Sequence, residues 1–102
     1  MIRTSYDDLL CIKSSDNYVI IYNLVDGQSS RHMIRNTMKN IQSQLSTQNL
    51  IKCHRSYLVN ISKIKAIEGN ITNSKLTIEG LDATIPVSRS KVPEIRELLV
   101  NS

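Results

Sequence analysis

The apolar residues of this chain lie in short runs, each closed within a few residues by serine, asparagine, aspartate or glycine. The segments LLCIKSS and NYVIIYNL have strand length, and their β-branched side chains suit a pleated sheet. The polar link Ser14-Ser15-Asp16 separates these two segments. Asp26-Gly27 then predicts a hairpin turn, because glycine takes positive φ at no steric cost, and QSSRHMI is the returning strand. The pattern therefore predicts short antiparallel strands.

One segment in the middle of the chain has a different period. Met38, Ile41 and Leu45 recur at i, i+3 and i+7 on one helical face. This period predicts a helix over roughly Thr37 to Gln44, with Asn36 or Thr37 as the N-cap. Strand patterning then resumes in LIKC, SYLVN, KIKAIEG, SKLTIEG and ATIPVS, where charged and aliphatic residues interleave as in a sheet with one wet face.

The last segment is amphipathic and is predicted to be helical, with Ser90 as its N-cap and Ile95, Leu98 and Leu99 as its apolar residues. Pro93 falls in the first turn, where backbone N–H groups have no helical partner anyway. The overall prediction is a mostly-β fold of small antiparallel sheets, with one short central helix and a C-terminal helical segment. A helix-turn-helix fold needs two or three helices that this pattern does not supply.

The composition fits one globular domain over residues 1–102, with 40% apolar and 22% charged residues. No apolar run is long enough to span a membrane and no signal-peptide pattern opens the chain, so we expect a cytoplasmic location. Cys11 and Cys53 are too few for a disulfide framework, and their aliphatic neighbours indicate core side chains. A redox bridge between them is the alternative interpretation.

Positive charge is concentrated in the middle of the chain. The net charge is +4, and no acidic residue lies between Asp26 and Glu68. The cations in that interval are Arg31, Arg35, Lys39, Lys52, Arg55, Lys63 and Lys65. An interval of one sign favours a polyanionic partner over a basic face that is simply solvated.

The segment IKCHRSYLVN places a cysteine next to a histidine, which raises the question of catalysis or metal binding. Neighbouring side chains of a strand point to opposite faces, so Cys53 and His54 cannot form a nucleophile and base pair. Two cysteines and two histidines without zinc-site spacings do not predict a zinc site. The three glycines are isolated turn residues rather than a phosphate-binding loop. The sequence therefore indicates binding, without enzyme activity, metal or cofactor.

Arginines stand beside serines at two distant places, Arg55 in CHRSY and Arg89 in IPVSRS, each where a strand meets a link. An arginine presents a planar pair of donors to guanine or to phosphate. Short polar side chains that suit phosphate oxygens and base edges stand near the same links: Ser14, Ser15, Asn17, Ser56, Ser88 and Ser90. The tyrosines fall mostly in apolar runs, which favours a duplex over a single-stranded target.

These segments resemble one known family. DNYVIIY, RNTMKNIQSQL, IKCHRSYLVNISKIKAIEG, KLTIEG and IPVSRS occur in the order and spacing of the LytTR-type DNA-binding domain, the output module of bacterial response regulators of the LytR/AlgR kind. The resemblance covers about Asp8 to Leu99. It implies an elongated arrangement of small antiparallel sheets, with about ten short strands and a short helix between them. It also implies transcription regulation through loops that read successive major grooves of promoter direct repeats.

The resemblance further implies that Arg55 lies in a tight turn, where the residue pattern alone indicates nearly continuous strand. Base contacts would come from Arg55, Arg89 and the first loop, where Asn17 and Tyr18 are the candidates. The residues implied to contact or position the DNA backbone are Lys13, Ser15, His54, Ser56 and Ser88. The lysines, with Arg31, Arg35 and Arg96, would add non-specific attraction to phosphate.

Most members of the family carry a phosphorylatable receiver domain ahead of this module. We therefore expect the chain to be the output part of a longer response regulator in a two-component system, rather than a stand-alone regulator, and dimerisation on DNA is a further implication. The alternative function is a protein-interaction module that binds an acidic partner domain through a basic face. Salt dependence separates the two, because DNA binding weakens steeply as counterions are released.

Overall fold

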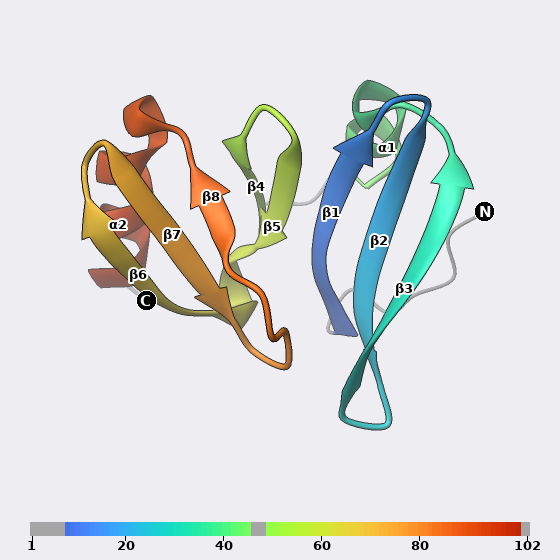
Figure 1. Ribbon diagram of the computed structural model, residues 1–102, viewed down its shortest axis with the longest axis horizontal. Coiled ribbons are helices and arrows are strands. Elements are labelled where there is room, and N and C mark those ends of the chain that lie inside the picture. Colours follow the sequence, from blue (N-terminus) through green and yellow to red (C-terminus); the bar gives the residue numbers. More distant parts are fainter. Residues whose placement is uncertain (1–7, 46–48, 101–102) are drawn as a thin grey trace.

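The computed structural model describes residues 8–45 and 49–100, and in this part eight strands form two antiparallel sheets (Figure 1). The five-stranded sheet has the order β3-β2-β1-β5-β4 and the three-stranded sheet the order β6-β7-β8. The strands are β1 (Leu9–Ser15), β2 (Tyr18–Val25), β3 (Gln28–Arg35), β4 (Leu50–His54), β5 (Tyr57–Asn60), β6 (Ile64–Asn70), β7 (Asn73–Ile78) and β8 (Ile85–Val87). The predicted mostly-β fold is confirmed.

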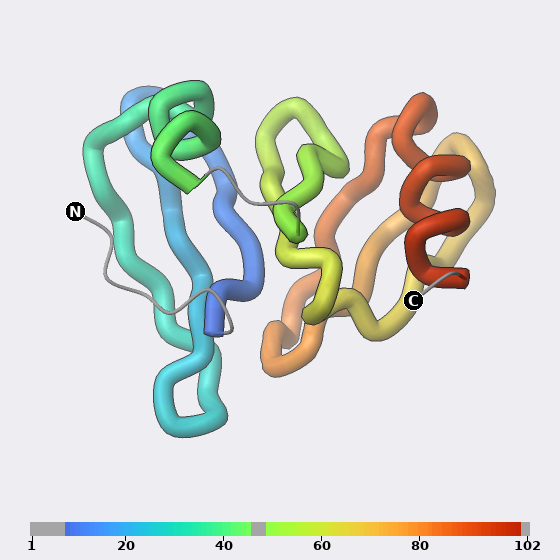
Figure 2. Tube along the Cα trace, turned by 180° about the vertical axis from the view of Figure 1, so that it is seen from behind, coloured from blue at the N-terminus to red at the C-terminus, as the bar shows by residue number. Residues whose placement is uncertain are grey.

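The helices are α1 (Met38–Gln44) and α2 (Val92–Val100), with short 3₁₀ turns η2 (Ile61–Lys63) and η3 (Arg89–Lys91). Seen from behind, both helices lie in front of the sheets, α1 over the β1–β3 half and α2 over β6 and β7 (Figure 2). Thr37 is the N-cap of α1, and its hydroxyl accepts the backbone N–H of Asn40 at 3.1 Å. The central helix therefore begins and ends where the sequence predicts it.

Two apolar clusters hold these layers together. Under α1, fully buried Ile41 packs against Ile12, Val19, Ile21 and Leu58 on one face of the five-stranded sheet. The second, larger cluster joins the two sheets and α2, and its members include Leu10, Cys11, Cys53, Val59, Leu76, Ile78, Ile85, Val92 and Ile95. Side chains alternate between the two faces of a strand, so β1 contributes to both clusters. Both cysteines are core residues, as predicted.

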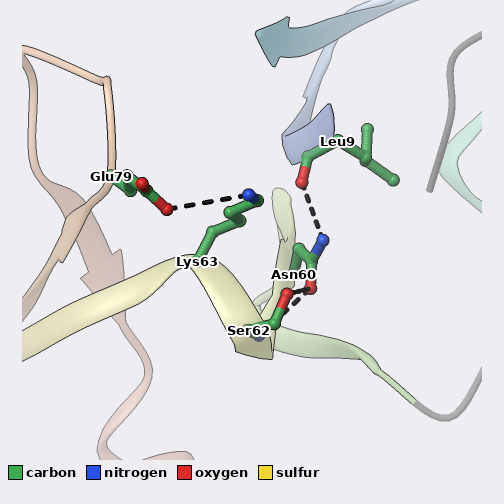
Figure 3. Close-up of polar contacts among 5 residues, drawn as sticks. All are labelled: Leu9, Asn60, Ser62, Lys63 and Glu79. Carbon is green, nitrogen blue, oxygen red and sulfur yellow. Dashed lines mark hydrogen bonds and ion pairs between the residues drawn. The ribbon is translucent and has the colours of Figure 1, made fainter. Parts of the chain in front are cut away.

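The two sheets meet at a buried asparagine at the end of β5 (Figure 3). The Asn60 side chain donates from Nδ2 to the carbonyl of Leu9 at 2.8 Å. Its Oδ1 accepts both the backbone N–H of Ser62, at 3.1 Å, and the Ser62 hydroxyl, at 2.8 Å. One step further, the Lys63 ammonium lies 3.6 Å from the Glu79 carboxylate. Asn60 thus ties β1 to the turn that leads into β6.

Three details of the local prediction are corrected. His54 ends β4 and Tyr57 begins β5, so Arg55 and Ser56 form a two-residue turn and the pattern of nearly continuous strand was wrong. Ser14 and Ser15 belong to β1, and the link to β2 is Asp16-Asn17. The predicted cap Ser90 lies inside η3. The first helical hydrogen bond runs from the Lys91 N–H to the Ser88 carbonyl, so the N-cap is Ser88, two residues before the predicted cap.

Candidate nucleic-acid interface

Three connections lie along one edge of the molecule, spread over its longest axis (Figure 1). They are the β1–β2 turn, the β4–β5 turn and the corner between β8 and η3, all at the top of the view. Asn17, Arg55 and Arg89 lie in these three connections in that order, and all three side chains are exposed. The fold therefore brings together residues that are far apart in the sequence.

The β1–β2 turn begins with Asp16 at a φ of 54°, a left-handed conformation that aspartate tolerates better than most residues. Asn17 follows, and its carbonyl accepts the backbone N–H of Asn36 at 3.2 Å, which holds the turn to the start of α1. Ser15 and Tyr18 face each other across the strands, and both are exposed. The turn presents Asn17 and Tyr18 to solvent on a fixed backbone.

The β4–β5 turn is held by its own histidine. The backbone N–H of Ser56 donates to Nδ1 of His54 at 3.2 Å, so the imidazole takes the place of a turn-forming asparagine. The His54 ring meets the Tyr57 ring edge to face with 5.8 Å between centroids, and the Lys13 ammonium lies 5.8 Å from the same Tyr57 ring. Arg55 extends from this braced turn.

The corner after β8 is tied to the same hairpin. The backbone N–H of Ser88 donates to the carbonyl of Cys53 at 2.8 Å, just before Arg89 opens η3. On the other side, the backbone N–H of Ser14 donates to the carbonyl of Ser56, also at 2.8 Å. The β4–β5 hairpin is therefore hydrogen-bonded to the segments on both sides of it, and these bonds link the three loops.

Within the described residues, no ion pair involves Arg55 or Arg89, whose guanidinium groups face solvent on this edge. The positioning candidates have a different environment: Lys13, His54, Ser56 and Ser88 are half-buried, and Ser15 is exposed. Sequence reasoning proposed Ser56 and Ser88 for their side chains, whereas the bonds observed use their backbone groups. It also missed Asn60, whose one visible signal is a polar residue closing the apolar strand YLVN.

The cysteines are free and buried. Burial raises the pKa of both thiols from 9.0 to about 12, and for Cys11 the neighbouring Cys53 adds to the effect. Cys11 lies on β1 and Cys53 on β4, with β5 between them, so the strands are about 10 Å apart, beyond the reach of a disulfide. The described residues also contain no group of three metal-ligating side chains, and none of their helices is long and apolar enough to cross a membrane.

The fold, two small antiparallel sheets with two helices, is that of a β-sheet DNA-binding module. The chain belongs to the LytTr DNA-binding domain family, whose sequence model matches residues 1–100. It is accordingly a regulator domain and not an enzyme. The solved LytTr DNA-binding domain of a methyl-accepting/DNA response regulator from Bacillus cereus superposes with a TM-score of 0.71 at 23% identity, covering 96% of this chain and 86% of that one.

One of two similar proteins is a transcriptional regulator by name and the other is a sensory transduction protein. The chain is 45% identical over 58 residues to the transcriptional regulatory protein YpdB of Escherichia coli, which covers 56% of this chain and 24% of that protein. It is 30% identical over 93 residues to the sensory transduction protein LytT of Enterococcus faecalis, covering 91% of this chain and 37% of LytT. The chain thus spans well under half the length of these relatives.

Proposed function

We propose that this chain binds duplex DNA in a sequence-specific manner through its three-loop edge, as the output module of a response regulator. The observation that supports this proposal most is the pair of exposed arginines, Arg55 and Arg89, carried on one edge by loops that share hydrogen bonds. Arginine in the major groove is the commonest reader of guanine, through two parallel hydrogen bonds. Asn17 and Tyr18 add a third contact from the β1–β2 turn.

The dimensions suit successive grooves of a duplex. The longest extent of the molecule is 36 Å, and the three loops are spread along that axis (Figure 1). One turn of B-DNA measures about 34–36 Å, so a duplex laid along this edge meets all three loops within about one helical turn. Lys13, Ser15, Ser56 and Ser88 approach the DNA backbone around the loop tips, and His54 positions the turn that carries Arg55.

The biological setting is part of the same proposal. The relatives extend well beyond the matched region, and by name YpdB is a transcriptional regulatory protein and LytT a sensory transduction protein. We infer that a receiver domain accompanies this module in the full-length protein, that the protein works in the cytoplasm, and that pairs of modules occupy direct repeats in promoters. Residues 1–102 act as one domain in this scheme.

Selection of bound fragments from a random duplex pool tests the function directly, because it returns both the preferred site and its spacing. On that site Arg55→Ala and Arg89→Ala should each weaken binding by about 1–3 kcal/mol and relax the preference at one base pair. Lys75→Ala, which removes an exposed cation from β7, is the control. It should leave the base preference unchanged and affect only the salt dependence of binding. Equal losses on selected and random duplexes would show that the arginines meet only phosphate.

A further inference from the structure

The face of β1, β2 and β3 opposite α1 carries an apolar centre framed by cations. The register places Lys13, Ile20 and Met33 side by side in one row across the three strands. Tyr18 pairs with Arg35 in the row nearer the loop edge, and Tyr22 pairs with Arg31 in the row farther from it. We call the surface formed by Lys13, Tyr18, Ile20, Arg31, Met33 and Arg35 the β2–β3 face.

Exposure distinguishes this surface from ordinary sheet. Met33, which lies on β3 and pairs with Ile20, is 61% exposed, and Tyr18, two residues before Ile20 on β2, is 42% exposed, whereas Ile20 itself is 8% exposed. Both helices lie on the other side of the molecule, as Figure 2 shows. A single exposed methionine is common on soluble proteins, but tyrosine, methionine and arginine together are the types enriched at protein interfaces. Methionine also adapts its shape to different partners.

The charge on this face selects the partner. Arg31, Arg35 and Lys13 are three cations, and no carboxylate is among the six side chains of the face. The nearest acidic residues in the sequence, Asp16 and Asp26, stand in the turns at the two ends of β2. Three positive charges around a small apolar site are complementary to a segment that is rich in glutamate or aspartate and carries an aliphatic side chain.

Distance separates most of this surface from the loop edge. Arg35 lies in the last row of β3, next to the β1–β2 turn, whereas Met33 and Arg31 are about 7 and 13 Å further back at 3.3 Å per residue. A duplex resting on the loop tips leaves Met33 and Arg31 free, and phosphate offers no counterpart to the methionine. We propose that the β2–β3 face docks an acidic protein segment with apolar anchors, while the loop edge is free to hold DNA.

The test uses the free chain and a short glutamate-rich peptide that carries two leucines, followed by the methyl NMR signals of Met33 and Ile20. We expect saturable shifts of both methyl groups, and binding about tenfold weaker in Met33→Glu and in Arg31→Glu. Ile71, which is 53% exposed in the β6–β7 turn, is the matched control: its methyl signals should not shift, and Ile71→Glu should bind the peptide normally.

Two further arms decide what the face recognises. The same peptide with serine in place of leucine should fail to saturate; equal binding would reduce the face to unspecific positive charge and overturn the proposal. The leucine peptide is then added to the chain already saturated with its selected duplex, where it should still bind and shift the Met33 methyl signal, although Lys13 and Tyr18 also belong to the proposed DNA contacts. Displacement of the peptide by DNA would assign the face to the duplex. Because the first titration contains no DNA, it holds or fails independently of the proposed function.

Discussion

His54 is expected to control sequence preference without touching DNA, by holding the turn that carries Arg55. Its Nδ1 accepts the Ser56 N–H at 3.2 Å, and a hydrogen bond of this kind contributes about 0.5–1.5 kcal/mol net. When His54→Ala removes the acceptor, the turn populates other conformations and the binding-competent fraction falls by a corresponding factor. The affinity for the selected duplex should therefore drop by about 2- to 12-fold, with little change on random duplex.

Two replacements separate the hydrogen bond from the packing. His54→Asn should recover most of the affinity, because an asparagine side chain accepts the N–H two residues ahead in the same way. His54→Phe keeps a ring against Tyr57 but has no acceptor, so it should behave like His54→Ala. The exposed His32→Ala, on β3, is the control for removing an imidazole as such.

A double-mutant cycle with Arg55→Ala gives the decisive measurement, by fluorescence anisotropy on selected and random duplexes. If His54 acts only by positioning Arg55, its replacement should have almost no effect once Arg55 is alanine, so the coupling equals the whole effect of His54→Ala. Additive losses, or an equal loss on random duplex, would show instead that His54 contacts the DNA backbone and would refute the positioning role. Urea unfolding of each variant checks that the fold is intact.

Three further predictions concern the stability of the sheets and of α1, which support the loops. Asn60→Ala should lower the free energy of unfolding by about 2–3 kcal/mol in urea titrations, because it leaves the carbonyl of buried Leu9 without its donor. Asn70→Ala breaks the same kind of side-chain turn at an exposed site and should stay within about 1 kcal/mol; equal losses would contradict the role of burial. The unfolded thiols of Cys11 and Cys53 ionise near 9.0 while the folded ones stay neutral to about 12, so stability present below pH 9 is lost as the pH rises through this window. Between pH 8.5 and 10 the two thiols should remove about 2.5 kcal/mol, a loss that a variant with both replaced by alanine should not show. Thr37→Ala should lower the unfolding free energy by about 1 kcal/mol through loss of the α1 cap, and an unchanged urea midpoint would argue against that bond.

Local chemistry explains why much of this fold could be predicted from the sequence. The helix at Thr37 has its cap and its period within one short segment, and Asp26-Gly27 adopts the two positive φ values that a tight hairpin needs, 55° and 79°. The turn at Arg55 has no glycine, proline or asparagine, and the feature that closes it is the acceptor nitrogen of His54. A residue pattern does not distinguish that role of a histidine from a place in a strand.

The candidate site was less predictable, because its order depends on backbone bonds between distant segments. Serines near the links drew attention to these connections, yet Ser14 and Ser88 act through N–H groups that every residue except proline has. Which carbonyl each group meets follows from the strand order β1-β5-β4 and from β8 reaching β4. That information is in the tertiary packing and not in any one segment.

The arrangement of these bonds has a consequence for how such loops can read sequence. A guanidinium on a long, free side chain loses conformational entropy on binding, and a mobile loop adds a further loss for every residue that becomes ordered. Here the β4–β5 turn is fixed from within by His54 and from both sides by Ser14 and Ser88, so only the Arg55 side chain has to become ordered on binding. Discrimination between base pairs then depends on hydrogen-bond donors that are held at a fixed spacing. A loop that was free to move could shift and form hydrogen bonds to an incorrect base pair. In the proposed function, the strands and their clusters contribute to specificity by keeping the loop spacing constant.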